Sequence, residues 1–498
     1  MTQRARWLFI AITFFALIYN SFLPLHPDEA YYWTWSRHLA WSYYDAPPMV
    51  AYLIWLSTHV FGTSAFTVKL VSVLCITVGA YLIHQLTQRL FDSKTAEVAL
   101  VITLLIPFVQ AGYLLTTPDS PLLLFWTATL YAFYLALDTG KTRYFYLAGL
   151  CAGLMLLSKY TGVLLLVALF GYLIFSPQRR HFKNAHLYLA GVLALAVFSP
   201  VILWNAQNHW VSFLFQWHHG TGGYHGFSGK YLGQFLGGQL GVFNPVWFMM
   251  MLVFVIGYGG RKILHRGQDG NTMSSRPSSR DLGNKNAYLP FLLWPFLLTW
   301  LFFLYQACFT KSQPNWPAPA YVSAIMLLAY WLVKGQWRKT YIVGIVVSMV
   351  VVVVVKFPML FPFMPPKDML LNKFLGYQQV MQQAAKYYYP GEVVLSDSYQ
   401  RASEAAFYLP GRPEVYIITP TRKSQITMWS QSIKHQAQQG NIPQALYIGQ
   451  DSQHHVLQQY FPHIQTHALI TLKWMSPVVV NKLTIIAPRS HRSVQRLL

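Results

Sequence analysis

Three acidic side chains, Asp28, Glu29 and Asp45, lie within one aromatic-rich stretch, residues 26–48. Acids are scarce in this chain, since only 15 of its 498 residues are Asp or Glu. A carboxylate suits general-base chemistry, because it can take a proton from a hydroxyl or amine and can stabilise positive charge on an oxocarbenium-like sugar. The surrounding tyrosines and tryptophans could stack on a sugar, or could form an aromatic belt at a membrane surface. We interpret the stretch as a candidate reaction centre.

A fourth acid, Asp119, lies in a very short Thr- and Pro-rich turn between two apolar runs. Ionisable groups at a membrane boundary are costly and usually functional. Structural roles are the alternative: Asp28 and Asp119 could be N-caps of the helices that follow them. Glu29 and Asp45 could likewise have a purely structural role. The catalytic candidates are Asp28, Glu29 and Asp119.

Several cations could complement these acids by holding a lipid-linked phosphate at the bilayer surface. Lys159 is the strongest candidate among them, because it lies between two apolar helices. Its ammonium there requires a phosphate or carboxylate partner, or must extend to the membrane–water interface. The glycine-rich segment at residues 218–229 carries histidines that match no standard metal-binding spacing, so we predict no metal and no cofactor. The candidate phosphate-binding residues are Arg37, Lys159, His218, His219 and His225.

The composition indicates a membrane protein. The chain is 54% hydrophobic and 10% charged, against roughly 25% charged in an average soluble domain. Its net charge of +22 comes from short basic clusters between apolar runs, a pattern that favours cytoplasmic loops over a nucleic-acid surface. No Walker A or GxGxxG motif is present, so a nucleotide-binding site is not expected.

A membrane helix needs about 20 apolar residues, and about eleven runs come near that length. The basic clusters place the N-terminus inside and the stretch at residues 26–48 outside. We predict a transmembrane domain at residues 1–356, with a first outer loop at residues 24–65. The eleven runs are 7–23, 66–88, 96–115, 119–137, 144–158, 160–176, 187–204, 245–261, 287–307, 317–333 and 340–356.

The chain changes character after residue 356. Short β-branched runs predict strands near residues 393–395, 415–418, 445–448, 470–472 and 478–486, and residues 402–408 look helical. We predict a small α/β domain at residues 357–498, outside the membrane.

The motifs along the chain resemble those of bacterial dolichyl-phosphate-mannose-protein mannosyltransferase-like proteins, which are GT-C glycosyltransferases related to lipid A aminoarabinose and galacturonic acid transferases. The matching segments are PDEAYYWTWSRHLAWSYYDAPPMVAYLI, FGTSAFTVKLVSVL, TTPDSPLLLFW, LSKYTGVLLL, SPVILWNAQNHWVSFLFQ, SQPNWPAPAY and YQRASEAAFYLPGRPEVY.

This resemblance implies a multi-spanning enzyme that uses a polyprenyl-phosphate sugar at the outer face of the plasma membrane. The catalytic acid of the family's first outer loop maps onto Asp28, with Glu29 beside it, and Tyr44 and Asp45 map onto a substrate-binding segment. Many relatives have a basic residue where this chain has Ala46, which shifts phosphate binding to other cations.

The resulting prediction is an inverting glycosyltransferase that moves a sugar from a polyprenyl-phosphate donor to a lipid A, polysaccharide or protein acceptor, with membrane lipid but no nucleic acid as a partner. One alternative is a transporter or flippase of a lipid-linked sugar. That alternative would predict charges within the spans and paired repeats, whereas this sequence places its acids at one face and shows no repeat. Another is a non-catalytic membrane scaffold.

Overall fold

The computed structural model describes residues 1–221, 226–268, 289–357, 372–418, 420, 422–439, 441–442, 444–450, 453–470 and 478–484. By its internal contacts the chain divides into two compact units. The first unit comprises Met1–Asn20, Ala46–Val50 and Leu70–Lys356, and the second comprises Ser21–Asp45, Ala51–Lys69 and Phe357–Leu498. The second unit therefore joins most of the first outer loop to the chain that follows Lys356.

The first unit is helical. Each of the eleven apolar runs coincides with a helix or with two successive helices, which confirms their helical prediction. The helices of this unit are α1 (Gln3–Ser21), α4 (Ala65–Leu90, from Leu70 onward), α5 (Ser93–Leu105), α6 (Pro107–Gly112), α7 (Asp119–Thr139), α8 (Thr142–Ser158), α9 (Val163–Phe175), α10 (Ala185–Gln207), α11 (Val211–Thr221), α12 (Gly229–Phe243), α13 (Pro245–Gln268), α14 (Leu289–Ala307), α15 (Ala318–Lys334) and α16 (Arg338–Lys356).

Five described helices, α4, α7, α10, α14 and α16, are long and apolar enough to cross a membrane. The count rises to seven if two sharply bent helix pairs, beginning at Tyr160 and Gly229, each form one span. Shorter apolar helices include α8 and α15. The polytopic membrane fold is thus confirmed, with fewer spans by length and composition alone than the eleven predicted.

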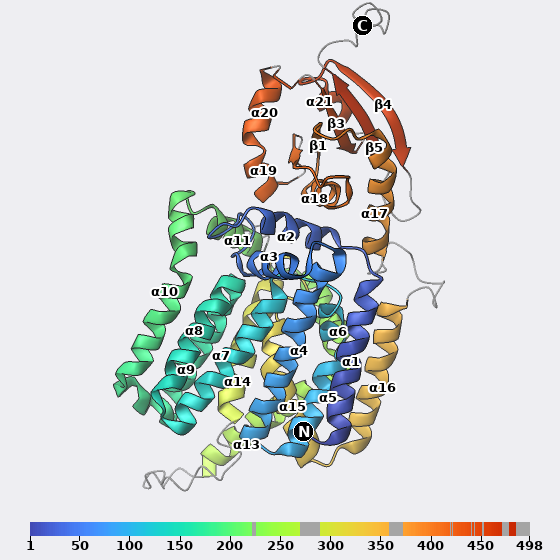
Figure 1. Ribbon diagram of the computed structural model, residues 1–498. Helices are drawn as coiled ribbons and strands as arrows, with labels where there is room; N and C mark the ends of the chain where they lie inside the picture. The colour runs from blue at the N-terminus through green and yellow to red at the C-terminus, as the bar shows by residue number, and fades with distance from the viewer. Residues whose placement is uncertain are drawn as a thin grey trace, which may run out of the picture. The chain divides into compact units, whose positions relative to one another are not determined.

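Helix packing in the first unit uses small residues. Gly149 and Gly153, four residues apart on α8, face α10, where a Cβ atom on Gly149 would clash with the Ala190 backbone and one on Gly153 with the Val197 side chain. This spacing of small residues lets helix backbones approach closely in a bilayer. Accordingly α8 packs against both α7 and α10 (Figure 1).

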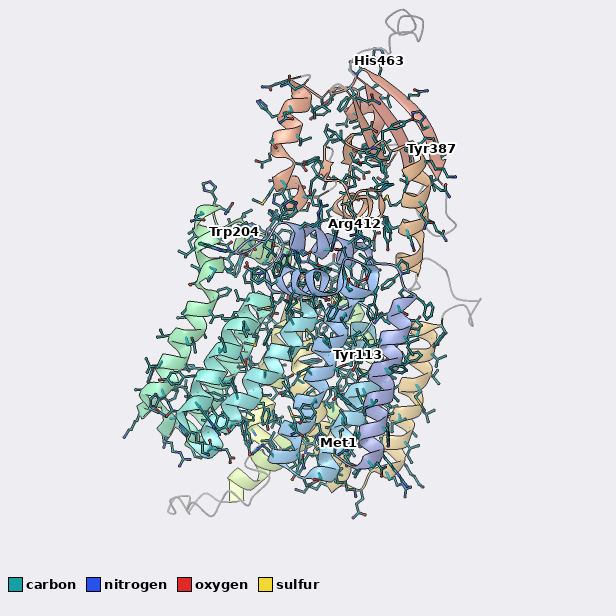
Figure 2. The ribbon with its side chains drawn as sticks, in the orientation of Figure 1. Met1, Tyr113, Trp204, Tyr387, Arg412 and His463 are labelled. Carbon is teal, nitrogen blue, oxygen red and sulfur yellow. The ribbon has the colours of Figure 1, made fainter. Side chains whose placement is uncertain are left out.

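Polar contacts fix the N-terminal helix within the same unit. The Asn20 side-chain amide donates to the carbonyl oxygen of Tyr113 at 2.6 Å, and the Tyr19 hydroxyl donates to the carbonyl oxygen of Lys356 at 2.5 Å. Tyr113 is labelled among the helices of this unit in Figure 2, and α1 lies beside α16 in Figure 1. A buried amide without such a partner would be costly in lipid.

The second unit combines helices with a five-stranded sheet of order β2-β1-β3-β5-β4. Strand β1 pairs in parallel with both β2 and β3, and β5 pairs antiparallel with β3 and β4. The strands are β1 (Val393–Ser396), β2 (Val415–Ile417), β3 (Gln444–Gly449), β4 (His463–Ile470) and β5 (Val478–Thr484). The helices are α2 (Pro27–Arg37), α3 (Met49–Phe61, from Ala51 onward), α17 (Asn372–Ala384), α18 (Tyr399–Tyr408), α19 (Gln425–Trp429), α20 (Gln431–Gln438) and α21 (His454–Leu457).

These elements confirm the α/β prediction after residue 356, although residues 471–472 and 485–486 lie outside the described residues. The parallel connection from β1 to β2 runs through α18, as a parallel pair requires a crossover. Leu395, Ala445, Tyr447 and Phe461 form the buried core beneath the sheet. Helix α18 also packs on α2, where the Trp33 and Phe407 rings meet edge to face at 4.9 Å. The sheet therefore holds a helix that supports the first outer loop.

Candidate active site

Helix α2 presents the first two acids, and its N-terminus explains their different environments. The N-cap is His26, whose side chain accepts from the Asp28 backbone N–H at 3.2 Å, while the Glu29 carboxylate accepts from the His26 backbone N–H at 2.9 Å. This reciprocal capping box satisfies two N–H groups that the helix leaves without partners. Asp28 is therefore not the N-cap, and its side chain remains 34% exposed.

Glu29 lies in a buried ion pair. Its carboxylate accepts from the Lys69 ammonium, and both side chains are fully buried. The same ammonium lies 4.5 Å from the centroid of the Phe374 ring. Lys69 is not among the candidate residues found from the sequence. Its position within the first turns of an apolar helix was the available signal, because an ionised group there requires a partner.

A second buried carboxyl group, Glu404 on α18, is electrostatically coupled to this pair. Its two oxygens have no hydrogen-bond partner among the described residues. Burial raises the pKa of Glu404 well above 4.5, and Glu29 raises this pKa further, whereas Lys69 lowers it. Burial of this kind favours the neutral form of the carboxyl group over the charged form.

Glu404→Gln should stabilise the protein progressively as the pH rises. Because the pKa of Glu404 is higher in the folded than in the unfolded state, its contribution is fully present below pH 4.5 and is lost as the pH rises through the folded pKa. A glutamine removes this proton requirement, so the gain in Tm over the wild type should be smallest at acidic pH. Thermal unfolding in detergent across a pH series measures this difference. A pH-independent difference would contradict the raised pKa of Glu404 in the folded protein.

Asp45 is held by a network with the segment before α19. The Tyr31 hydroxyl donates to its Oδ2, the Arg422 guanidinium contacts its Oδ1 at 2.9 Å, and the Gln425 backbone N–H lies 3.4 Å from Oδ2. Burial raises the pKa of Asp45 to about 6, while Arg422 and the Tyr31 hydrogen bond oppose that rise. Tyr44 joins the network by donating its backbone N–H to the Gln425 side chain at 2.7 Å.

Asp28 faces a tyrosine of α18. The Tyr399 hydroxyl donates to Asp28 Oδ1 at 3.2 Å, and burial followed by the Asp28 charge raises the pKa of Tyr399. The Tyr399 ring lies 4.6 Å from that of Tyr31 and 4.5 Å from the Arg422 guanidinium. Within the second unit, Asp28 and Asp45 are thus connected through two tyrosines and one arginine. Tyr399 begins the matching segment YQRASEAAFYLPGRPEVY, but no sequence pattern assigned either Tyr399 or Arg422 to the site.

Arg37, a predicted phosphate ligand, pairs with a carboxylate instead. Its guanidinium contacts Glu414 at 2.6 Å, and His38 Nε2 lies 3.1 Å from the same carboxylate. The hydrogen bond from His38 lowers the pKa of Glu414, and the Arg37 charge lowers it further. Arg37 remains a candidate phosphate ligand, now with a partner that such binding would have to displace.

In the first unit, the structure brings Lys159 and Asp119 together. The Lys159 ammonium lies 2.6 Å from Asp119 Oδ1, and the Asn315 amide donates to Oδ2 at 3.1 Å. Asp119 is the first residue of α7, whose N-cap is Pro118, so Asp119 is not the N-cap. The predicted need of Lys159 for a carboxylate or phosphate partner is met by a carboxylate. Its side chain is 23% exposed, so the ammonium is not sealed from a second ligand.

The predicted histidine cluster is only partly described. His218 contacts the Leu214 carbonyl oxygen through Nδ1 at 2.6 Å, and the His219 ring stacks on Phe215 at 5.6 Å. His225 lies outside the described residues. No group of three or more metal-ligating side chains occurs among the residues that could be searched. Phosphate binding by these histidines stays a prediction.

Comparison with known proteins places the chain in a class. Residues 45–204 match the family model described as dolichyl-phosphate-mannose-protein mannosyltransferase. Lipid A galacturonosyltransferase RgtD of Rhizobium johnstonii is 25% identical over 374 residues, which cover 72% of each protein. Two crystal structures of ArnT from Cupriavidus metallidurans share the fold. The apo form has a TM-score of 0.66 and 14% sequence identity, and the match covers 97% of this chain and 99% of the ArnT chain. The form bound to undecaprenyl phosphate has a TM-score of 0.67 and 16% sequence identity, and the match covers 96% of this chain and 98% of the ArnT chain.

The fold is that of a polytopic membrane protein, and the sequence matches are to glycosyltransferases. The family resemblance seen in the sequence is confirmed. Residues 45–204 resemble the dolichyl-phosphate-mannose-protein mannosyltransferase family, and the chain is similar to RgtD in sequence and to ArnT in fold.

Proposed function

We propose that the protein transfers a sugar from a polyprenyl-phosphate donor to a lipid A acceptor at the periplasmic face of the inner membrane, with Asp28 as the base. The observation that supports this most directly is the contrast among the three acids of the first outer loop. The side chain of Asp28 is 34% exposed, whereas those of Asp45 and Glu29 are 10% and 0% exposed. Asp28 is thus the loop acid that a substrate can reach without unfolding the loop.

The relatives support the donor and acceptor classes. RgtD is named for lipid A galacturonosyl transfer, and one ArnT structure holds undecaprenyl phosphate. In the proposed reaction, an acceptor hydroxyl attacks the anomeric carbon as its proton passes to the Asp28 carboxylate. The bond from that carbon to the phosphate oxygen breaks, and polyprenyl phosphate leaves with the electron pair. A single displacement of this kind inverts the anomeric configuration.

The environment of Asp28 suits this step. The Tyr399 hydroxyl at 3.2 Å fixes one carboxylate oxygen, and the side chain keeps contact with solvent. A base acts through hydrogen-bond geometry first, so an oriented and accessible carboxylate is the relevant feature. Glu29, fully buried against Lys69, serves the fold of the loop in this proposal.

The test uses the purified protein in detergent with a radiolabelled undecaprenyl-phosphate sugar and lipid A. Label should move to the lipid A fraction, and undecaprenyl phosphate should accumulate in equal amount. Polysaccharide and peptide acceptors run in parallel decide the acceptor class. If no acceptor receives label and the intact labelled donor moves across the membrane of reconstituted vesicles, the proposal fails. The protein is then a transporter or flippase of a lipid-linked sugar.

Lys159→Ala should raise the apparent KM for the donor by roughly tenfold, the effect of losing one hydrogen bond to a charged group. We propose that the ammonium beside Asp119 contributes to holding the donor phosphate. Steady-state kinetics at saturating acceptor measure this effect. Lys141→Ala is the matched control, since Lys141 is exposed at the opposite end of α8. An unchanged donor KM in Lys159→Ala would rule out a phosphate role.

A further inference from the structure

Arg422 is an arginine of the C-terminal segment held against the first outer loop. Its Nη2 lies 2.9 Å from Asp45 Oδ1, and its guanidinium carbon lies 4.5 Å from the centroid of the Tyr399 ring. The Arg422 side chain is 43% exposed, although the Asp45 side chain that it contacts is only 10% exposed. The guanidinium is therefore oriented by a nearly buried carboxylate and an aromatic face while it remains accessible to solvent.

The carboxylate that orients Arg422 is itself fixed. The Tyr31 hydroxyl donates to Asp45 Oδ2, and the Gln425 backbone N–H donates to the Tyr31 oxygen at 2.7 Å. Gln425 is also anchored through its side chain, which accepts from the Tyr44 backbone N–H at 2.7 Å. An arginine whose partner is this well anchored loses little conformational freedom on binding a ligand, because its geometry is already set.

This guanidinium lies one aromatic ring away from the proposed base. The Tyr399 ring lies against Arg422, and the Tyr399 hydroxyl donates to Asp28 Oδ1 at 3.2 Å. A sugar transferred to an acceptor at Asp28 must have its phosphate close by, since that phosphate departs from the anomeric carbon under attack. A planar guanidinium offers several N–H donors to phosphate oxygens.

We propose that Arg422 binds the phosphate monoester of the polyprenyl-phosphate donor, with Asp45 and Tyr399 as positioning residues. This inference rests on the proposed function, because it assigns the donor phosphate to the same site. It makes the segment before α19 a contributor to donor recognition, and it gives the C-terminal segment a role in substrate binding besides its structural one.

Arg422→Gln tests this proposal. The apparent KM for the donor, and the Kd for undecaprenyl phosphate added alone, should both rise by roughly ten- to a hundredfold, as expected for a lost charge-assisted contact. The KM for lipid A should stay within about twofold. The acceptor also carries phosphate, so a rise in the lipid A KM with an unchanged donor KM would assign Arg422 to the acceptor and overturn the proposal.

Arg412→Gln is the matched control. Arg412 also connects the C-terminal segment to the first outer loop, since its Nη2 donates to the Thr63 carbonyl oxygen at 2.9 Å and its guanidinium lies 5.4 Å from the Phe407 ring centroid (Figure 2). Neither of these two contacts of Arg412 involves Asp28 or Asp45. Its replacement should leave the donor KM and the undecaprenyl phosphate Kd unchanged. An equal loss of donor and undecaprenyl phosphate binding in the two variants would show that Arg422 has only a structural role.

A second substitution covers the case in which Arg422→Gln does not fold. Arg422→Lys keeps the charge beside Asp45 but lacks the planar fork of donors, so it should fold and should weaken undecaprenyl phosphate binding by a smaller factor. Wild-type affinity in this variant, in protein with normal Tm, would overturn a role for the guanidinium. If the wild-type protein transfers no sugar but Arg422→Lys still weakens undecaprenyl phosphate binding, the phosphate site stands and the proposed reaction fails.

Discussion

Asp28→Asn should abolish sugar transfer while leaving the protein folded. The kcat should fall by a factor of about 10² to 10⁴, the usual contribution of a general base. Asparagine has the size of aspartate, and its side-chain oxygen can still accept the hydrogen bond from Tyr399. It cannot take a proton from the acceptor. The 34% exposure of Asp28 also keeps the structural cost of the change small.

Initial rates of label transfer to lipid A measure this effect, with thermal unfolding in detergent as the folding check. Asp138→Asn is the control, because it makes the same substitution at an exposed aspartate near the C-terminal end of α7. It should retain kcat within a few fold. Turnover close to that of the wild type in Asp28→Asn would refute the assignment of Asp28 as the base.

The second large effect concerns stability. Lys69→Met should lower the free energy of unfolding by about 3 to 5 kcal/mol, the range found when one partner of a buried ion pair is removed. Lys69 and Glu29 are both fully buried, so the substitution would leave the buried Glu29 carboxylate without the ammonium that it contacts. Methionine preserves most of the volume, so the loss reports on charge more than on packing.

Thermal unfolding of the purified variant measures this loss, and the yield of extracted protein should fall with it. Adding Glu29→Gln to Lys69→Met should recover much of the stability, because the double variant no longer buries an uncompensated charge. Lys386→Met serves as the control at an exposed lysine of the same unit. A wild-type Tm in Lys69→Met would show that the pair contributes nothing to the fold.

The elements of the transmembrane region could be predicted because lipid imposes a simple rule. An apolar run must form a helix there, and each predicted run did. Helix α3 shows the limit of the rule. Its 13 residues are apolar but too short to span a bilayer, and they were assigned only to the loop. The strand order was also beyond sequence reasoning, because the pairing of β5 between β3 and β4 depends on contacts between separate strands.

The candidate site could likewise be predicted only in part. The acids could be found from their scarcity and aromatic surroundings. The different environments of these acids could not be predicted, because the partners that distinguish the acids lie elsewhere in the chain. Lys69 follows Glu29 by 40 residues, and Arg422 follows Asp45 by 377 residues. The placement of Lys159 was informative by itself, since a lysine between two apolar helices requires a partner.

The packing of α2 on α18 has a consequence for biosynthesis. Asp28 and Tyr399 are 371 residues apart, so the hydrogen bond between them cannot form until the chain has been synthesised at least as far as Tyr399. The first acid to be synthesised is thus among the last to reach its final surroundings. A chain released early would insert its helices yet lack the contacts that orient Asp28, so partial products would be inactive.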